Sequence, residues 1–175
     1  ASRSWAVVIG IDAYESISPL KSSMTDAQSF WEYLTTNLGV PGIRIQLLLG
    51  SKKRTSPESS KFRDDPMYPS HVHITTMLLS LIDNPDIKKG DNIIIYYAGH
   101  GSSYQCSDYN DVKNADYHEI GPESTGYIEA LCPIDHDTVD ENGNTIPDIS
   151  DREFNTILTL ISQAKGNHIT IILDC

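Results

Sequence analysis

The 175-residue chain has no long hydrophobic run and few cysteines, and both absences narrow its class. No apolar stretch approaches the roughly 20 residues of a membrane-spanning helix. The N-terminal stretch is too short for the apolar region of a secretory signal and lacks a small-residue cleavage site. The three cysteines show no CxxC spacing, which supports neither a disulfide framework nor a zinc site. We therefore expect a soluble protein with no membrane partner, in the cytoplasm or alternatively in the nucleus.

Basic charge is also scarce. Thirteen Lys and Arg oppose 24 Asp and Glu, a formal net charge of -11, which would repel a nucleic-acid backbone. The one basic cluster lies in a Ser- and Pro-rich stretch typical of a solvated loop and comprises Lys52, Lys53, Arg54, Lys61 and Arg63. We expect no nucleic-acid partner. The acidity suits a basic peptide or a divalent cation, although solubility alone would also explain it.

Four short apolar runs rich in Val, Ile and Tyr predict strands at 5–11, 43–50, 92–99 and 168–175. Runs that are apolar on both faces are typical of a parallel sheet covered by helices. Helical patterns lie between them. They predict three helices: one opened by the capping box Thr25/Gln28 and stopped at Gly39, one ending before Pro85, and one opened by Ser150/Glu153 and ending near Gly166.

This alternation predicts one α/β domain over 1–175, a three-layer sandwich with a mainly parallel sheet. Residues 51–70 and 102–150 are expected as long polar loops within it. In the second loop, residues 126–135 are expected to form a short strand or hairpin. Ligand and catalytic groups in such sheets lie beyond the carboxyl ends of the strands.

Gly99-His100-Gly101 ends the third predicted strand. The flanking glycines would allow a sharp turn and leave the imidazole uncovered, and the Gly101 N–H would be free to form half of an oxyanion hole. His100 is thus a candidate general base, although the three residues could equally form a plain turn.

A thiol partner for the base is available at the neighbouring strand. Cys175 ends the fourth strand, so parallel pairing would place it near His100 for acyl transfer. The alternative is a small buried apolar residue. Cys106, in a polar loop, and Cys132, before Pro133, are weaker candidates.

Five segments together resemble a known family: "WAVVIGIDAY", "LKSSMTDAQSFWEYL", "GDNIIIYYAGHG", "EALCPID" and "ITIILDC". In this order they are similar to landmarks of the large-subunit domain of caspase-like cysteine peptidases, closest to metacaspases and fungal caspase-domain proteins. The resemblance implies a caspase-like (caspase-haemoglobinase) fold whose small-subunit part is missing here. It also implies a cysteine endopeptidase, linked to programmed cell death, with His100 as the base.

The family motif Asp-x-Cys-His-Ser-Gly sets the position of the nucleophile. Asp174 matches its aspartate, so Cys175 falls on the "x" and the nucleophile would be the next residue, beyond this sequence. In the other register Cys175 acts itself, with a thiolate that depends on a neighbouring histidine. In the first register the chain alone would be inactive.

Two alternatives to a peptidase follow from the same residues. A catalytically silent caspase-homology module could bind a partner through the sheet edge. We expect that edge, at the fourth strand, to be covered by a small-subunit segment, a second chain or a symmetry mate. A flavodoxin-like module is disfavoured because residues 10–14 contain no Gly-rich phosphate loop.

The resemblance also implies a substrate pocket. Asp26 of "TDA" and Asp174 of "LDC" match the two carboxylates that favour Arg or Lys before the scissile bond. Asp26 could instead, or in addition, complement the dipole of a helix N-terminus. Ala98 replaces a usual serine and Ser23 a frequent cysteine, so we expect one pocket hydrogen bond to be lost.

Residues 135–151 place six carboxylates within 17 residues. An EF-hand is excluded because the loop lacks glycine at its sixth and glutamate at its twelfth position. Several metacaspases need calcium, and at the likely binding positions this chain has Ile128 and Ser150 and keeps only Asp151. We therefore expect no required cofactor, and an acidic surface loop is the simpler interpretation of residues 135–151. Calcium binding at Asp151 is the weaker alternative.

Overall fold

The structure of the protein is a computed structural model that describes residues 3–14, 16–51, 65, 67–105 and 126–175. The basic cluster at 52–63, Cys106 and most of the expected loop 51–70 lie outside the described residues. None of the helices described in these ranges has the length and apolar character needed to span a membrane.

Four parallel strands form the central sheet, as predicted. They are β1 (Ser4–Ile11), β2 (Ile45–Gly50), β3 (Asn92–Ala98) and β7 (Ile169–Asp174), in the order β2-β1-β3-β7. The two central strands β1 and β3 are almost wholly buried, because helices cover both faces of the sheet. Their continuous apolar runs place apolar side chains on both of these faces. β7 lies at the edge and is largely exposed.

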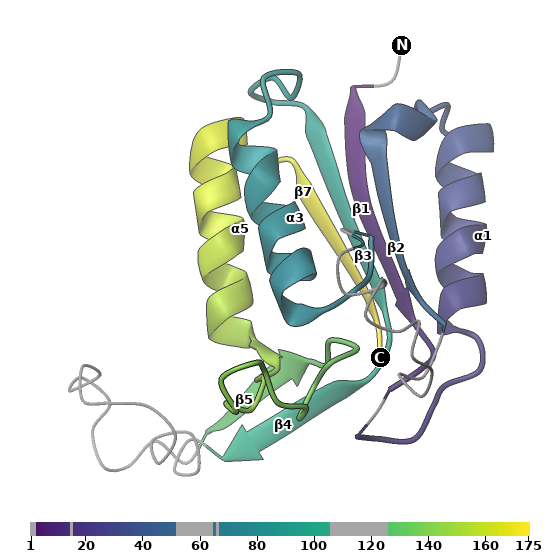
Figure 1. The fold of residues 1–175 in the computed structure, drawn as a ribbon. Coiled ribbons are helices and arrows are strands. Elements are labelled where there is room, and N and C mark those ends of the chain that lie inside the picture. Colours follow the sequence, from purple (N-terminus) through teal and green to yellow (C-terminus); the bar gives the residue numbers. More distant parts are fainter. Residues whose placement is uncertain (1–2, 15, 52–64, 66, 106–125) are drawn as a thin grey trace.

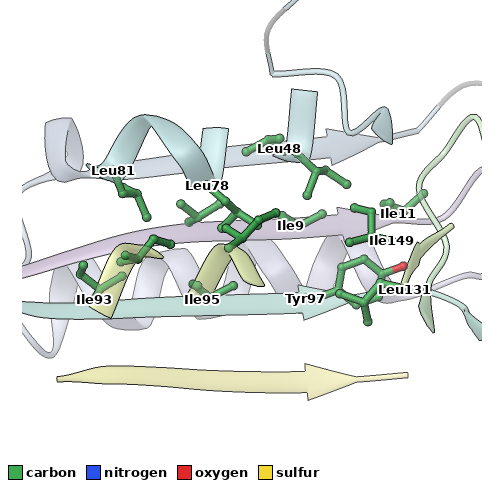
Figure 2. Close-up of a cluster of buried hydrophobic side chains, with 14 of the residues drawn as sticks. Ile9, Ile11, Leu48, Leu78, Leu81, Ile93, Ile95, Tyr97, Leu131 and Ile149 are labelled. Atoms are coloured by element: carbon green, nitrogen blue, oxygen red, sulfur yellow. The ribbon is translucent and has the colours of Figure 1, made fainter. Parts of the chain in front are cut away.

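Helices cover the sheet on both faces, which confirms the three-layer prediction (Figure 1). α1 (Ser23–Thr36) packs on one face, and α3 (His71–Asp83) and α5 (Asp151–Lys165) pack on the other; a short 3-10 turn, Gly42–Arg44, precedes β2. On the α3 face, Leu78 belongs to the buried cluster that also includes Ile9 and Ile95 (Figure 2).

The predicted helix starts are correct for α5 but not for α1. The Ser150 hydroxyl accepts a hydrogen bond from the Glu153 N–H at the start of α5. The first helix begins at Ser23 rather than after Thr25, and its Met24 N–H donates to the Asp12 carboxylate at 3.3 Å. This cap comes from the end of β1, so local spacing could not reveal it.

A second, antiparallel sheet occupies part of the expected polar loop 102–150. It comprises β4 (Gly101–Gln105), β5 (Tyr127–Leu131) and β6 (Ile149–Ser150), in the order β4-β5-β6. The short strand expected within 126–135 is β5. β4 was missed because antiparallel strands tolerate one solvent-facing side, so "GSSYQ" lacks an apolar run. The chain passes from β3 into β4 through Gly99 and His100 (Figure 1).

Candidate active site

The carboxyl ends of β3 and β7 bring the two expected dyad residues to one place. Ala98 pairs with Asp174, and the Gly99 N–H donates to the Asp174 carbonyl at 3.3 Å. Cys175 follows directly. Its Sγ lies 3.4 Å from the point that a Cβ on Gly101 would occupy, so the thiol lies against the glycine turn. Parallel pairing of adjacent strands produces this juxtaposition.

The His100 ring is oriented by a backbone carbonyl. Its Nε2 lies 2.8 Å from the Ser18 carbonyl oxygen, in the segment between β1 and α1. A carbonyl can only accept, so Nε2 carries the proton and Nδ1 keeps the basic lone pair. The Tyr14 ring packs against the imidazole with centroids 5.0 Å apart. The Ser18 carbonyl and the Tyr14 ring therefore fix the orientation of the imidazole.

Two buried tyrosines hold the backbone of His100. Its N–H donates to the Tyr14 hydroxyl at 2.8 Å, and its carbonyl oxygen lies 2.8 Å from the Tyr97 hydroxyl, which donates. The Tyr97 hydroxyl also reaches the Cys132 carbonyl at 2.8 Å, and the two hydroxyls lie 3.4 Å apart. Burial raises the pKa of Tyr14 to about 12 and that of Tyr97 well above its ordinary value. Both remain neutral, as these hydrogen bonds require.

The tyrosine pair changes the interpretation of Gly99. A Cβ at this position would lie 2.6 Å from both the Tyr14 and Tyr97 hydroxyl oxygens, so glycine is needed to make room for them. Neither Gly99 nor Gly101 has a positive φ. The chain bends at Gly99, as expected, and the missing side chain there also makes room for the two hydroxyls. The two tyrosines lie in segments that the sequence marks as landmarks, but no local pattern gives their role.

The two carboxylates expected in a substrate pocket act on one side chain. The Tyr96 hydroxyl donates to Asp174 Oδ2 at 3.3 Å, and Asp26 lies in the first turn of α1 on the same face. Burial, then the charges of Asp174 and Asp26, raise the pKa of Tyr96 to about 12. Ala98 and Ser23 are both buried in this layer.

A pocket of about 540 Å³ opens on the other side of the turn. Gly101, Cys175, Glu129, Asp151 and Phe154 are among the residues that line it, and Asp26 and Asp174 are not. Asp151 is exposed at the start of α5.

The other calcium positions offer no free carboxylate. Ile128 is buried, and the Ser150 hydroxyl is engaged in capping α5. Calcium binding at Asp151 stays a prediction.

Comparison with known proteins gives the family. Residues 4–175 match the family model described as metacaspase, peptidase C14 domain. The chain is 31% identical to metacaspase-3 of Arabidopsis thaliana over 162 residues, which is 91% of this chain and 36% of that protein. It is 26% identical to metacaspase-1A of Aspergillus oryzae over 130 residues, covering 74% of this chain and 25% of that protein.

A solved structure agrees with the fold. A crystal structure of a protein from Geobacter sulfurreducens superposes with a TM-score of 0.59 at 13% identity, covering 97% of this chain and 48% of that one. The chain thus spans about a third or less of the length of these curated relatives. Its fold is caspase-like. The match across 4–175 shows that the chain belongs to the metacaspase family of C14 peptidases.

Proposed function

We propose that the protein is a cysteine endopeptidase that cleaves peptide bonds after Arg or Lys through a Cys–His dyad. One observation carries the proposal: His100 lies at the end of β3 with Nε2 bonded to Ser18, beside a thiol at the end of the adjacent strand. Nδ1 is then free to take a proton. Family membership supports the same reaction class.

The proposed reaction assigns a role to each of these groups. His100 Nδ1 takes the thiol proton, and the thiolate attacks the peptide carbonyl carbon. The N–H groups of Gly101 and of the nucleophile bind the oxyanion. The imidazolium then protonates the leaving amine as the C–N bond breaks, leaving a thioester. A water molecule, deprotonated by the same imidazole, hydrolyses the thioester and restores the thiol.

The nucleophile is either Cys175 or the residue that the family motif places after it. We would treat the active protein with a peptide chloromethyl ketone ending in Arg and locate the adduct by mass spectrometry. An adduct on either position, abolished by His100→Ala, supports the dyad. Full labelling and full activity in His100→Ala would refute it.

Specificity for basic residues is proposed from the carboxylates around Tyr96. Asp174 and Asp26 both act on the Tyr96 hydroxyl on the α1 face, where a guanidinium or ammonium group would find two negative charges. Hydrogen bonds to charged groups contribute about 1.5–3 kcal/mol. Asp174→Asn should therefore lower kcat/KM for an Arg substrate by about 10- to 150-fold.

Fluorogenic peptides with Arg, Lys, Ala or Asp before the scissile bond would test this specificity. The exposed Glu141, changed to Gln, is a matched control that also removes one charge. Tyr96→Phe separates loss of the tyrosine hydrogen bond from loss of the carboxylate. Equal rates for Arg and Asp substrates, or Arg cleavage unchanged in Asp174→Asn, would contradict the assignment while leaving the dyad intact.

We further propose that an additional strand, from a small-subunit segment or a second chain, pairs with β7. Among the described residues β7 pairs with β3 alone, and Ile171, Ile172 and Leu173 are 38%, 36% and 51% exposed. Open apolar edges are usually covered. Hydrogen exchange in the full-length protein should show slow exchange at every amide of 169–174. Fast exchange at alternate amides would show that the edge is open.

A further inference from the structure

Three buried side chains of different chemistry converge beside the turn that holds His100. Cys132 and His136 follow β5, and Asp148 precedes β6. They are 2%, 6% and 7% exposed, and one ligating atom from each lies within 4.8 Å of the others. No pattern in the sequence predicts a function for His136 or Asp148. The absence of CxxC spacing disfavoured a zinc site.

Two of the converging atoms have no hydrogen-bond partner. His136 Nδ1 and Asp148 Oδ1 are fully buried, and among the described residues each has only the other as a close polar contact and neither makes a hydrogen bond. They lie 2.5 Å apart, but the contact does not have hydrogen-bond geometry. Leaving a buried polar group unpaired costs about 1–3 kcal/mol. A cation that both atoms bind would remove this cost.

The remaining polar atoms of the same side chains are already engaged. His136 Nε2 lies 3.2 Å from Asp137 Oδ2, and Asp148 Oδ2 accepts from the Ser102 and Tyr104 hydroxyls. Metal-binding histidines typically donate their second N–H to a carboxylate, and metal-binding carboxylates are themselves hydrogen-bonded. The outer contacts of a metal site are therefore in place, and Nδ1 and Oδ1 are the atoms left for the metal.

We propose that Cys132 Sγ, His136 Nδ1 and Asp148 Oδ1 bind a zinc ion. One thiolate, one imidazole and one carboxylate suit Zn²⁺, whereas Ca²⁺ and Mg²⁺ prefer oxygen ligands alone. Zinc bond lengths place tetrahedral ligands about 3.3–3.8 Å apart, so binding would separate the histidine and aspartate atoms by about 1 Å. A water molecule or a substrate atom would take the fourth position.

The site is joined to the turn that carries the proposed base. The Cys132 N–H donates to the His100 carbonyl at 3.0 Å, and the Tyr97 hydroxyl reaches the carbonyl oxygens of both residues. A zinc ion on the Cys132 side chain would therefore stabilise the segment on which His100 rests. The Cys175 thiol, a candidate for the dyad, is not among the three proposed ligands.

Zinc titration of the metal-free protein against a chromophoric chelator tests the proposal. We expect one ion per chain. Cys132→Ser and Asp148→Asn should weaken binding by at least about 100-fold, and loss of the outer contact in Asp137→Asn by about 10- to 100-fold. Cys175→Ser is the matched control and should bind normally. Absence of binding, or binding lost in Cys175→Ser and kept in Cys132→Ser, would overturn the proposal, the latter by assigning zinc to the dyad.

A spectroscopic measurement covers the case in which the ligand variants fail to fold. In Cys106→Ser/Cys175→Ser, Cys132 is the one remaining cysteine of the sequence. X-ray absorption of this zinc-loaded protein should show one sulfur at about 2.3 Å and nitrogen or oxygen at about 2.0–2.2 Å. A spectrum with no sulfur neighbour would overturn the assignment. Neither measurement depends on peptidase activity.

Discussion

Tyr14→Phe should damage the proposed active site without changing its packing. The substitution removes one oxygen atom, which accepts the His100 N–H at 2.8 Å across 86 residues of sequence. The phenylalanine ring keeps the contact with the imidazole. Tyr97 loses only the weaker 3.4 Å contact and keeps its two carbonyl acceptors. The variant therefore removes the hydrogen bond to the backbone of the proposed base together with this longer contact.

The magnitude follows from burial. Tyr14 is fully buried, so water would not replace its hydroxyl as the partner of the His100 N–H. Leaving such a donor unpaired costs about 1–3 kcal/mol in the free energy of unfolding. If misplacement of the imidazole raises the activation free energy by the same amount, kcat falls by about 5- to 150-fold with KM little changed. The pKa of Tyr14 is about 12, so the effect should be the same between about pH 6 and 9.

Urea unfolding and peptide hydrolysis measure the two quantities. Tyr33→Phe is the matched control, because its side chain is 48% exposed and its ring contact with Phe30 survives the change. The control should stay within about 0.5 kcal/mol of the parent protein. If Tyr14→Phe matched the control in both stability and kcat, the tyrosine pair would not position His100.

Three further predictions concern stability. Gly99→Ala places a Cβ 2.6 Å from two hydroxyl oxygens and should lower the free energy of unfolding in urea by about 1–3 kcal/mol. The control Gly42→Ala, whose Cβ has its nearest contact at 3.8 Å, should be tolerated. Equal losses of stability in the two variants would contradict the close approach. Burial raises the pKa of Asp91, but hydrogen bonds from a backbone N–H, an arginine and a tryptophan outweigh it and lower the pKa below its ordinary value. The stability from Asp91 is therefore fully present above about pH 4 and lost as the pH falls through the lowered pKa, so Asp91→Asn should flatten the acid limb of the stability curve; unchanged acid limbs would refute this. Ser150→Ala removes the cap of α5 and should cost about 0.5–2 kcal/mol in thermal unfolding, and an unchanged Tm would show that the cap contributes nothing.

The sequence predicted the elements whose signals are local. The four strands of the parallel sheet carry continuous apolar runs, and the Ser150 cap lies three residues from the N–H it binds. The antiparallel strand β4 was missed because exposed and partly buried residues alternate along it, and its polar sequence contains no apolar run. The start of α1 was misplaced because the cap comes from Asp12, 12 residues before Met24.

The sequence by itself determined the fold class, the family resemblance and His100 as the candidate base, because strand runs and a strand-end motif depend on residues that are close in the chain. Tertiary structure decided what holds that base: Tyr14 and Ser18 come from 86 and 82 residues away. It likewise decided that Cys132, His136 and Asp148 converge, although none of them belongs to a metal-binding spacing pattern. The reason is physical: sheet pairing and core packing bring together side chains from segments that are far apart in the chain, and periodicity along one segment does not encode this.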